Sequence, residues 1–288
     1  MRGIRKYYWL AKPGIVYSNV IAAIAGFFFA STIVGRLDIV SFLATVGGMG
    51  FVIASACVLN NYLDRAIDKK MKRTSWRATA TGKISTRAVF MYLGILGAVG
   101  FMLLIIFTNW LVVGLVALAY FSYIVLYGAA KRTTIHSTLI GTIPGGIPPV
   151  AGYAAVIGVL DYVTLLLFLA MVCWQMAHFY SIGMRRRDEY AAANLPVMPV
   201  VKGMHPTKVQ ILAYIAAFVV VVLLLVITSP LNFSFLAVMT ILGFVWFFRG
   251  VRGFKESNDQ AWAKRMFLFS LVVLLSFCSL LSIGVLLP

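Results

Sequence analysis

Seven long stretches without a charged residue constrain the fold of this 288-residue chain more than any other feature. They cover residues 13–35, 39–63, 88–130, 137–160, 162–184, 209–248 and 266–288. A helix needs about 20 mostly apolar residues to cross the hydrocarbon core of a bilayer. Hydrophobic residues make up 62% of the chain and charged residues only 11%, which leaves too little polar surface for a soluble protein. The sequence therefore predicts an all-α, polytopic membrane protein.

Two of these stretches are about twice the length that one span requires. Each has a turn signal near its middle, the sequence TNW at 108–110 in one and TSPLN at 228–232 in the other. Clusters of Thr, Ser, Asn and Pro between apolar segments are typical of loops. Each long stretch is therefore predicted to form a helical hairpin. With five single spans, the total is nine transmembrane helices.

The basic residues predict the orientation, because short cytoplasmic loops retain Lys and Arg. With the N-terminus inside, the inner segments are 2–12, 65–87, 131–132, 185–208 and 249–265. They hold 24 of the 25 basic residues, and only Arg36 lies outside. The C-terminus is then outside. No cleavable signal precedes the first span and the N-terminal segment is too short for a mitochondrial presequence, so we expect a bacterial cytoplasmic membrane.

The net charge of +17 is explained by the basic residues that hold the loops on the cytoplasmic side. Attraction of these residues to anionic lipid headgroups contributes as well. Nucleic-acid binding is not expected, since no soluble domain is present to carry it. The three cysteines have neither paired nor metal-type spacing and are expected to pack in the interior. They are Cys57, Cys173 and Cys278.

Half of the eight carboxylates fall in two clusters at the cytoplasmic ends of predicted helices. In the first, Asn60, Asp64 and Asp68 are spaced i, i+4 and i+8, so they share one helical face with about 6 Å of rise between neighbours. Carboxylates one turn apart repel each other unless a cation lies between them. These oxygen ligands suit Mg²⁺, which usually binds one or two carboxylates plus substrate phosphates. Phosphate-type donors follow directly: Lys69, Lys70, Lys72, Arg73, Arg77 and Lys83. A solvated helix end is the alternative.

The second cluster follows the sixth span and reads RRRDEY at 185–190, with Asn194 and Lys202 beyond it. A run of three arginines alone is an ordinary stop signal for a span. Its pairing with the first cluster suggests instead two acidic sites that hold two Mg²⁺ ions and clamp a diphosphate. A solvated role is expected for the other four acids: Asp38, Asp161, Glu256 and Asp259.

Polar residues inside the spans indicate an internal site, because burying them in lipid is expensive. Asn19 lies in the first span, and Gln175 and His178 lie three apart in the sixth. His178 is a candidate haem ligand or proton relay, or simply forms a hydrogen bond to a neighbouring helix. The sequence PGGIPP at 144–149 is expected to break or kink the fifth helix. Irregular backbone at membrane depth is tolerated only where it is buried or lines a cavity, so we expect a binding chamber.

Five segments resemble the UbiA superfamily of intramembrane prenyltransferases. They are KPG at 12–14, NNYLDRAIDKKMKRT at 60–74, GTIPGGIPPVAGY at 141–153, WQMAHFY at 174–180 and DEYAAANLPVMPVVKG at 188–203. Asn61 stands where the superfamily commonly has an acid, and Ala177 where a proline is expected. The resemblance implies two four-helix bundles plus a ninth helix around a central cavity that opens sideways to lipid. It implies a single domain over 1–288, with active-site loops near 60–87 and 185–208.

The superfamily members most similar in these segments act on haem. The resemblance therefore implies Mg²⁺-dependent transfer of a farnesyl group from farnesyl diphosphate to the 2-vinyl group of haem B, with hydration, in haem A and O biosynthesis for terminal oxidases. A haem A synthase or an oxidase subunit is an expected partner. The catalytic residues would be Asp64, Asp68 and Asp188, which with Asn60 would hold the metal. The diphosphate would contact Lys12, Arg73, Arg77 and Lys202, and haem would contact His178, Arg185 and Arg186.

Two other functions fit parts of the sequence. The first is prenylation of an aromatic quinone precursor on the same scaffold. The second is a transporter or a haem carrier without enzymatic activity. Transporters usually have inverted repeats and charged residues near the bilayer midplane. Here the acids gather at one membrane face, which favours an enzyme.

Overall fold

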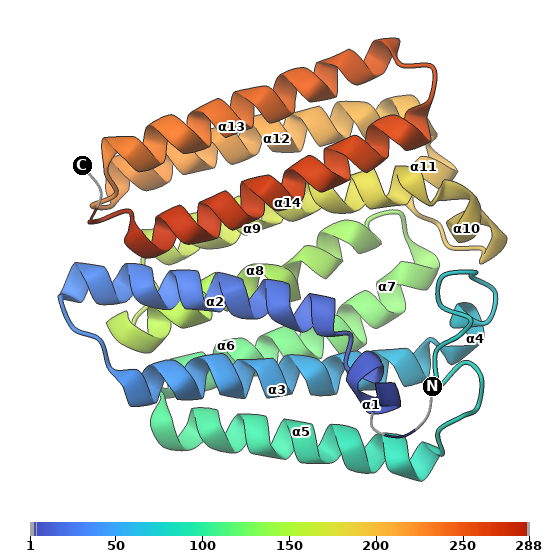
Figure 1. Ribbon diagram of the computed structural model, residues 1–288, viewed down its shortest axis with the longest axis horizontal. Coiled ribbons are helices and arrows are strands. Elements are labelled where there is room, and N and C mark those ends of the chain that lie inside the picture. The colour runs from blue at the N-terminus through green and yellow to red at the C-terminus, as the bar shows by residue number, and fades with distance from the viewer. Residues whose placement is uncertain (1–2, 4, 287–288) are drawn as a thin grey trace.

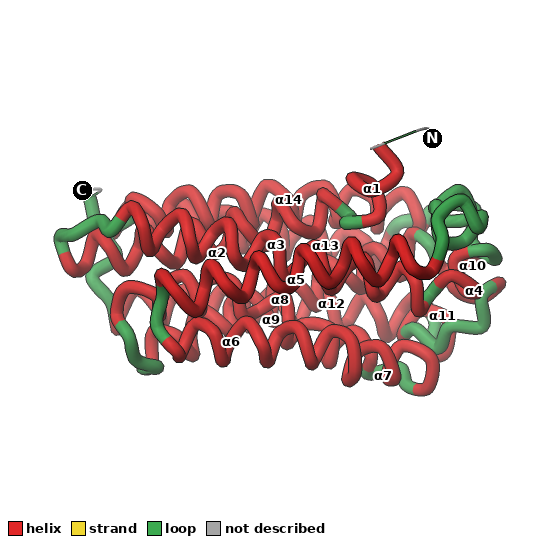
Figure 2. The backbone as a smooth tube through the Cα atoms, turned by 90° about the horizontal axis from the view of Figure 1, so that it is seen from below, coloured by secondary structure: helices red, strands yellow, loops and turns green. Residues whose placement is uncertain are grey.

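The computed structural model describes residue 3 and residues 5–286. Within that part of the chain every regular element is a helix, and Figure 2 shows loops gathered at the two ends of a long bundle. Nine helical segments are long and apolar enough to cross a membrane. The prediction of an all-α protein with nine spans is therefore confirmed. The spans are α2 (Pro13–Val34), α3 (Ile39–Leu63), α5 (Thr86–Phe107), α6 (Trp110–Phe121) with its continuation through η1 (Ser122–Tyr127) and α7 (Gly128–Thr133), α8 (Ser137–Ile157), α9 (Tyr162–Arg185), α12 (Met204–Thr228), α13 (Phe233–Arg252) with η2 (Gly253–Lys255), and α14 (Asp259–Ile283).

Both predicted hairpins are present. The chain turns between Phe107 and Trp110, where the Asn109 side chain accepts a hydrogen bond from the amide of Val112 at 3.0 Å and caps α6. The same side chain donates to the carbonyl of Ala154 on α8 at 2.8 Å, which ties the turn to the core. The second turn separates α12 from α13 at residues 229–232.

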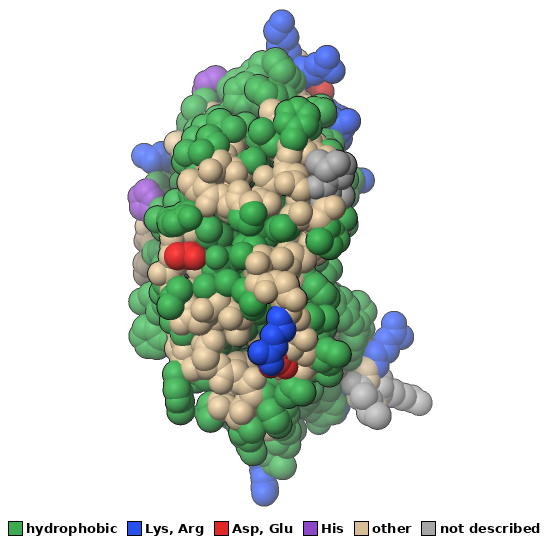
Figure 3. All heavy atoms as spheres, turned by 90° about the vertical axis from the view of Figure 1, so that its left-hand side faces the viewer, with side chains coloured by type: hydrophobic (Ala, Val, Ile, Leu, Met, Phe, Trp, Pro, Cys, Tyr) green, Lys and Arg blue, Asp and Glu red, His purple; other side chains and the backbone are tan. Residues whose placement is uncertain are grey.

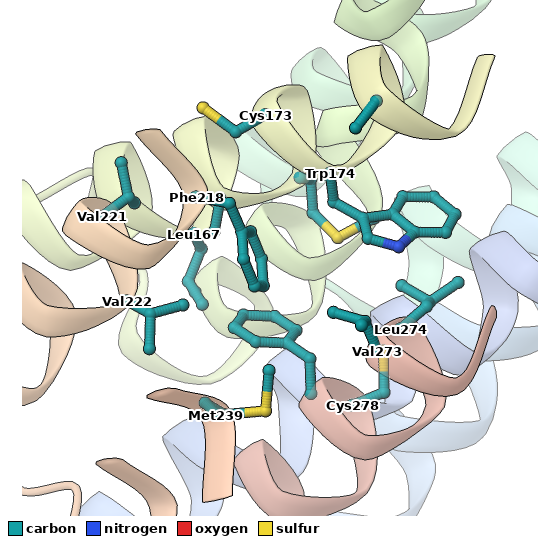
Figure 4. Packing of buried hydrophobic residues seen from close by; sticks show 14 of the residues in the cluster. Leu167, Cys173, Trp174, Phe218, Val221, Val222, Met239, Val273, Leu274 and Cys278 are labelled. Carbon is teal, nitrogen blue, oxygen red and sulfur yellow. The ribbon is translucent and has the colours of Figure 1, made fainter. Parts of the chain in front are cut away.

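The spans run side by side along the long axis of the molecule (Figure 1), and their contacts close on themselves. Helix α2 contacts α3, α8 and α14, and α8 also contacts α6 and α9. Helix α14 packs against α9 and α13, so the last span closes the arrangement beside the first. Figure 4 shows the core of the second half, where side chains from α9, α12, α13 and α14 converge around Phe218, Leu167 and Met239.

Helix α8 passes through its prolines without a break. The segment at 144–149 was expected to break or kink the helix, and the chain stays helical from Ser137 to Ile157 through three prolines. Of the two expected outcomes, the break is therefore excluded. Membrane helices tolerate proline where neighbouring helices satisfy the freed backbone groups, and Pro148 and Pro149 are buried within the bundle.

The short helices and the basic segments gather at one end of the bundle. Helices α1 (Arg5–Leu10), α4 (Arg65–Asp68), α10 (Arg187–Ala192) and α11 (Met198–Val201) all lie near the right-hand end in Figure 1. Figure 3 views the opposite end, where few charged side chains face the viewer. The carboxyl groups of Asp38 and Asp161 have a structural role there, since they cap α3 and α9.

Candidate functional site

A cavity of about 640 Å³ opens between α2, α3, α8, α9, α14 and the α6–η1–α7 span. Binding sites for small ligands fall in the range of roughly 300–1,000 Å³. Its walls differ at the two ends. Charged and polar side chains from the basic end include Lys12, Asn60, Asp64, Asp68, Arg73, Arg77, Lys131, Arg185 and Arg186. Apolar side chains line the rest, among them Met49, Val52, Val116, Ile147, Met171, Leu271 and Leu274.

The first acidic cluster lines this cavity as its spacing predicts. Helix α3 ends at Leu63 and α4 begins at Arg65, so Asp64 lies at a junction rather than within one helix. The amides of Asp64 and Asp68 nevertheless donate to the carbonyls four residues back, at 2.9 and 2.8 Å. The chain therefore keeps its helical register across the junction, and Asn60, Asp64 and Asp68 all line the same cavity.

Both carboxylates have cationic partners. Lys131 lies 2.6 Å from Asp64 Oδ2, and Arg132 lies 3.4 Å from Oδ1. Arg77 donates to both oxygens of Asp68, at 3.0 and 2.9 Å. Asp68 is buried, and a buried carboxylate is stable only when it is paired or hydrogen-bonded. The cations that could bind a diphosphate and the carboxylates that could bind a divalent ion therefore lie close together.

Lys12 adopts a backbone conformation that lysine rarely takes. It has φ 51° and ψ 65°, the left-handed region, although it directly precedes Pro13. Its ammonium donates to Oδ1 of Asn60 at 2.5 Å. Burial lowers the pKa of Lys12 to about 8, while Asp64 and Asp68 act in the opposite direction. An anionic group that entered the cavity would stabilise the charged form of Lys12.

Asn61, the departure from the superfamily pattern, is fully buried and does not line the cavity. Its side-chain amide donates to the carbonyl of Leu10, the last residue of α1, at 2.6 Å. Asn61 thus fixes the end of α1 two residues before Lys12. This contact gives Asn61 a structural role.

Arg73 and Arg77 line the cavity as expected for residues that bind a diphosphate. Partial burial lowers the pKa of Arg73, and the positive charges of Arg77 and Arg186 add to this effect. Arginine still keeps its charge at neutral pH. The two guanidinium groups therefore supply positive charge from the loop that follows α4.

The structure divides the second acidic cluster. Arg185 and Arg186 line the cavity, but Asp188 and Lys202 do not. Asp188 is exposed and accepts a hydrogen bond from Gln260 at 3.0 Å. The neighbouring Glu189 pairs with Arg186 at 2.8 Å, and its second oxygen, Oε2, is buried with no hydrogen-bond partner among the residues that the structure describes.

Some residues of the site carry no clear signal in the sequence. In the sequence, Lys131 is only one of the basic residues that predict the orientation of the spans. In the structure it lines the cavity and forms an ion pair with Asp64. Tyr123 and Tyr127 lie on the π-helical segment η1, stack at 5.7 Å and line the same wall. π-Helical turns inside α-helices are frequent at functional sites, but periodicity does not reveal them.

The polar residues of the sixth span also reach the cavity. Gln175 lines it and donates to the carbonyl of Met171 at 3.1 Å. His178 lines it too, and its Nδ1 lies 2.7 Å from the Ser270 hydroxyl. Asn19 lines the cavity from α2. All three intramembrane polar side chains therefore face an internal space rather than lipid.

The donor set fits a magnesium ion that also binds substrate. Among the described residues, no group of three or more His, Cys, Asp and Glu side chains is placed to hold a metal by itself. Two carboxylates and an amide oxygen do line one wall. That set suits Mg²⁺, which keeps near-octahedral geometry by adding water and phosphate oxygens.

Comparisons with known proteins agree with this geometry. Residues 19–272 match the UbiA prenyltransferase family. A protoheme IX farnesyltransferase from Yersinia pseudotuberculosis is 39% identical over 281 residues, which cover 97% of this chain and 95% of that protein.

Two solved structures share the fold. One, from work on digeranylgeranylglyceryl phosphate synthase, has a TM-score of 0.80 at 18% identity and covers 99% of both chains. The other is a UbiA homologue from Archaeoglobus fulgidus bound to GPP and Mg²⁺, with a TM-score of 0.70 at 13% identity, covering 96% of this chain and 99% of that one. The family match over residues 19–272 and the 39% identity over nearly the full length show that the chain belongs to the UbiA prenyltransferase family.

Proposed function

We propose that this protein transfers the farnesyl group of farnesyl diphosphate to the 2-vinyl group of haem B and so forms haem O. The full-length similarity to a protoheme IX farnesyltransferase supports this activity. The observation that carries the proposal is the cavity, which joins a charged end to an apolar chamber within the spans. A prenyl diphosphate has the same two parts, an anionic head and an apolar tail.

The diphosphate binds at the charged end in this proposal. Lys12, Arg73 and Arg77 donate hydrogen bonds that strengthen as negative charge builds on the leaving oxygen. Asn60, Asp64 and Asp68 are the residues that would hold Mg²⁺, which when bound supplies positive charge to the diphosphate. Neither acid of the second cluster lines the cavity, but Glu189 pairs with Arg186, which does, whereas Asp188 contacts Gln260. We therefore assign the supporting acid to Glu189.

The transfer step breaks one C–O bond and forms one C–C bond, and the hydration step then forms a new C–O bond. The bond between C1 and oxygen breaks as diphosphate leaves, and the apolar walls protect the allylic cation from bulk water. The vinyl π electrons attack C1, so the positive charge moves to the carbon beside the porphyrin ring. One water molecule adds to that carbon and loses a proton, which leaves the hydroxyethylfarnesyl group of haem O.

The haem is placed against the α9 and α14 walls. His178 reaches the cavity from α9, and Arg185 and Arg186 lie at the end of the same helix, where they are candidates to pair with the haem propionates. Apolar side chains of α14, Leu271 and Leu274, offer a surface for the porphyrin face.

The cellular setting belongs to the proposal as well. The chain has nine candidate spans in its described part. We place it in a bacterial cytoplasmic membrane as a single domain over 1–288, with the N-terminus in the cytoplasm and the C-terminus outside. Its haem O would pass to a haem A synthase or a terminal oxidase subunit as partner.

The test is a reconstituted reaction. Purified protein is incubated with haem B, farnesyl diphosphate and Mg²⁺, and the pigments are analysed by mass spectrometry. We expect a product heavier than haem B by one farnesyl group and one hydroxyl group, together with released diphosphate. A parallel reaction contains an aromatic quinone precursor as well, and prenylation of that precursor without any change in haem would overturn the proposal.

A further inference from the structure

The hydrogen bonds around Ser270 favour one of the two neutral tautomers of His178. Ser270 lies on α14 and is fully buried. Its hydroxyl lies 2.6 Å from the carbonyl of Phe267 and 2.7 Å from Nδ1 of His178. A serine hydroxyl has one hydrogen, so when it donates to the Phe267 carbonyl its oxygen accepts from Nδ1. Both contacts are hydrogen bonds at once in the tautomer of His178 whose proton is on Nδ1.

In that tautomer the second ring nitrogen, Nε2, carries a lone pair. It has no hydrogen-bond partner among the described residues, although His178 is more than nine-tenths buried. The imidazole stacks on Trp174 with ring centroids 4.7 Å apart and packs against the tilted ring of Phe267 at 5.0 Å. The His178 side chain lines the cavity.

Ser270 also fixes the ring that His178 stacks on. The indole nitrogen of Trp174 donates to the backbone carbonyl of Ser270 at 2.7 Å. Figure 4 shows Trp174 reaching from α9 toward α14 beside Leu274. One residue of α14 therefore holds two aromatic rings of α9 in place, and the imidazole has little freedom to rotate.

We infer that His178 Nε2 is the axial ligand of the haem iron and that Ser270 is its positioning residue. The inference rests on the proposed function, which supplies haem B as the substrate. Neutral imidazole is the form that binds metals, through the in-plane lone pair of the nitrogen that carries no proton. Histidines that bind metals almost always donate their other N–H to a fixed acceptor, as Nδ1 does here.

The test measures the iron–histidine bond in the absence of farnesyl diphosphate. Full-length protein is loaded with haem B, reduced, and examined by resonance Raman spectroscopy. We expect an iron–histidine stretching band in the wild-type protein and its loss in His178→Ala, with recovery of a band when free imidazole is added. Ser270→Ala should keep the band at a lower frequency and weaken haem binding by roughly 10–100-fold. Ser270→Thr, which keeps the hydroxyl, should restore both.

His205→Ala is the matched control, because that exposed histidine lies on α12 outside the cavity. Binding of farnesyl diphosphate without haem, measured by calorimetry, verifies that each variant is folded. An unchanged band in His178→Ala, or no band in the wild-type protein, overturns the ligand assignment. If the band behaves as expected but the wild-type protein forms no haem O, the proposed function fails instead. If haem O forms while the band is independent of His178, only the ligand assignment fails.

Discussion

Asp64 lines the cavity and forms ion pairs with Lys131 and Arg132. Asp64→Asn keeps the shape of the side chain but removes its negative charge. We expect turnover of farnesyl diphosphate to fall by roughly 10²–10³-fold, because a weakened magnesium site withdraws positive charge from the departing diphosphate, a loss comparable to that of one oxyanion-stabilising donor. The measurement is the initial rate of haem O formation at equal amounts of membrane-inserted protein. Near-normal turnover in this variant would remove Asp64 from the proposed metal site.

Asp188 and Glu189 are neighbours in sequence but differ in their surroundings. Glu189 pairs with the cavity residue Arg186, whereas Asp188 is exposed and contacts Gln260. Glu189→Gln should therefore lower haem O formation clearly, and Asp188→Asn should leave it close to the wild-type rate. Parallel rate assays of the two variants decide between them. A loss in Asp188→Asn as large as that in Asp64→Asn would return the role to Asp188.

At this scale the sequence predicts contacts within one element better than contacts between elements. The spacing of Asn60, Asp64 and Asp68 was sufficient to predict that their side chains lie together, because four residues make about one helical turn. The partner of Asp64, Lys131, is 67 residues away and comes close only through the packing of the spans. Adjacent acids such as Asp188 and Glu189 point about 100° apart on a helix, and spacing alone does not say which one pairs with an arginine of the cavity wall.

At the scale of whole elements, the hairpins were predictable and the irregular helices were not. Apolar length and turn residues determine where a span begins and ends. The π-helical segment η1 and the unbroken course of α8 depend instead on what packs beside them. Proline lacks the amide hydrogen that a helix uses, but the sequence does not show whether neighbouring helices compensate for its loss.

Helices α2 and α8 approach each other closely at two glycines. A Cβ atom at Gly26 would overlap the carbonyl oxygen of Pro149, and one at Gly152 would overlap the carbonyl oxygen of Ala23. Small residues allow membrane helices to pack backbone against backbone. We therefore expect Gly26→Ala and Gly152→Ala each to destabilise the protein by roughly 1–3 kcal/mol, the usual cost of overpacking.

Gly94 on α5 is the matched control, since a Cβ atom there meets nothing within 4 Å. Thermal unfolding in detergent, followed by loss of monodisperse protein, gives the comparison. Equal melting temperatures for Gly26→Ala, Gly152→Ala and Gly94→Ala would contradict the proposed close packing of α2 on α8.

For the whole molecule, hydropathy and charge predict the number of spans but not the cavity between them. The nine spans follow from the apolar stretches because each must satisfy its own backbone in lipid. The cavity forms because α2 contacts both α8 and α14, a long-range closure that no local pattern contains. The intramembrane polar residues Asn19, Gln175 and His178 indicated a chamber, since each is costly without one.

Orientation is the last whole-molecule property to test, and labelling of single cysteines decides it. The native residues Cys57, Cys173 and Cys278 are buried, so a membrane-impermeant maleimide should leave the wild-type protein unlabelled. Leu37, in the loop between α2 and α3, is 48% exposed, and Lys70, beyond α4, is exposed as well. The two positions lie at opposite ends of the spans.

In intact cells we expect the reagent to label Leu37→Cys, and to label Lys70→Cys only after the membrane is permeabilised. The reason is that the segment after α4 carries a dense group of lysines and arginines, which short loops keep on the cytoplasmic side, whereas Arg36 is the one basic residue at the other end. The reverse pattern would place Asp64, Asp68 and the diphosphate donors outside the cell. Cytoplasmic farnesyl diphosphate would then not reach them, so this result would contradict both the orientation and the proposed supply of substrate.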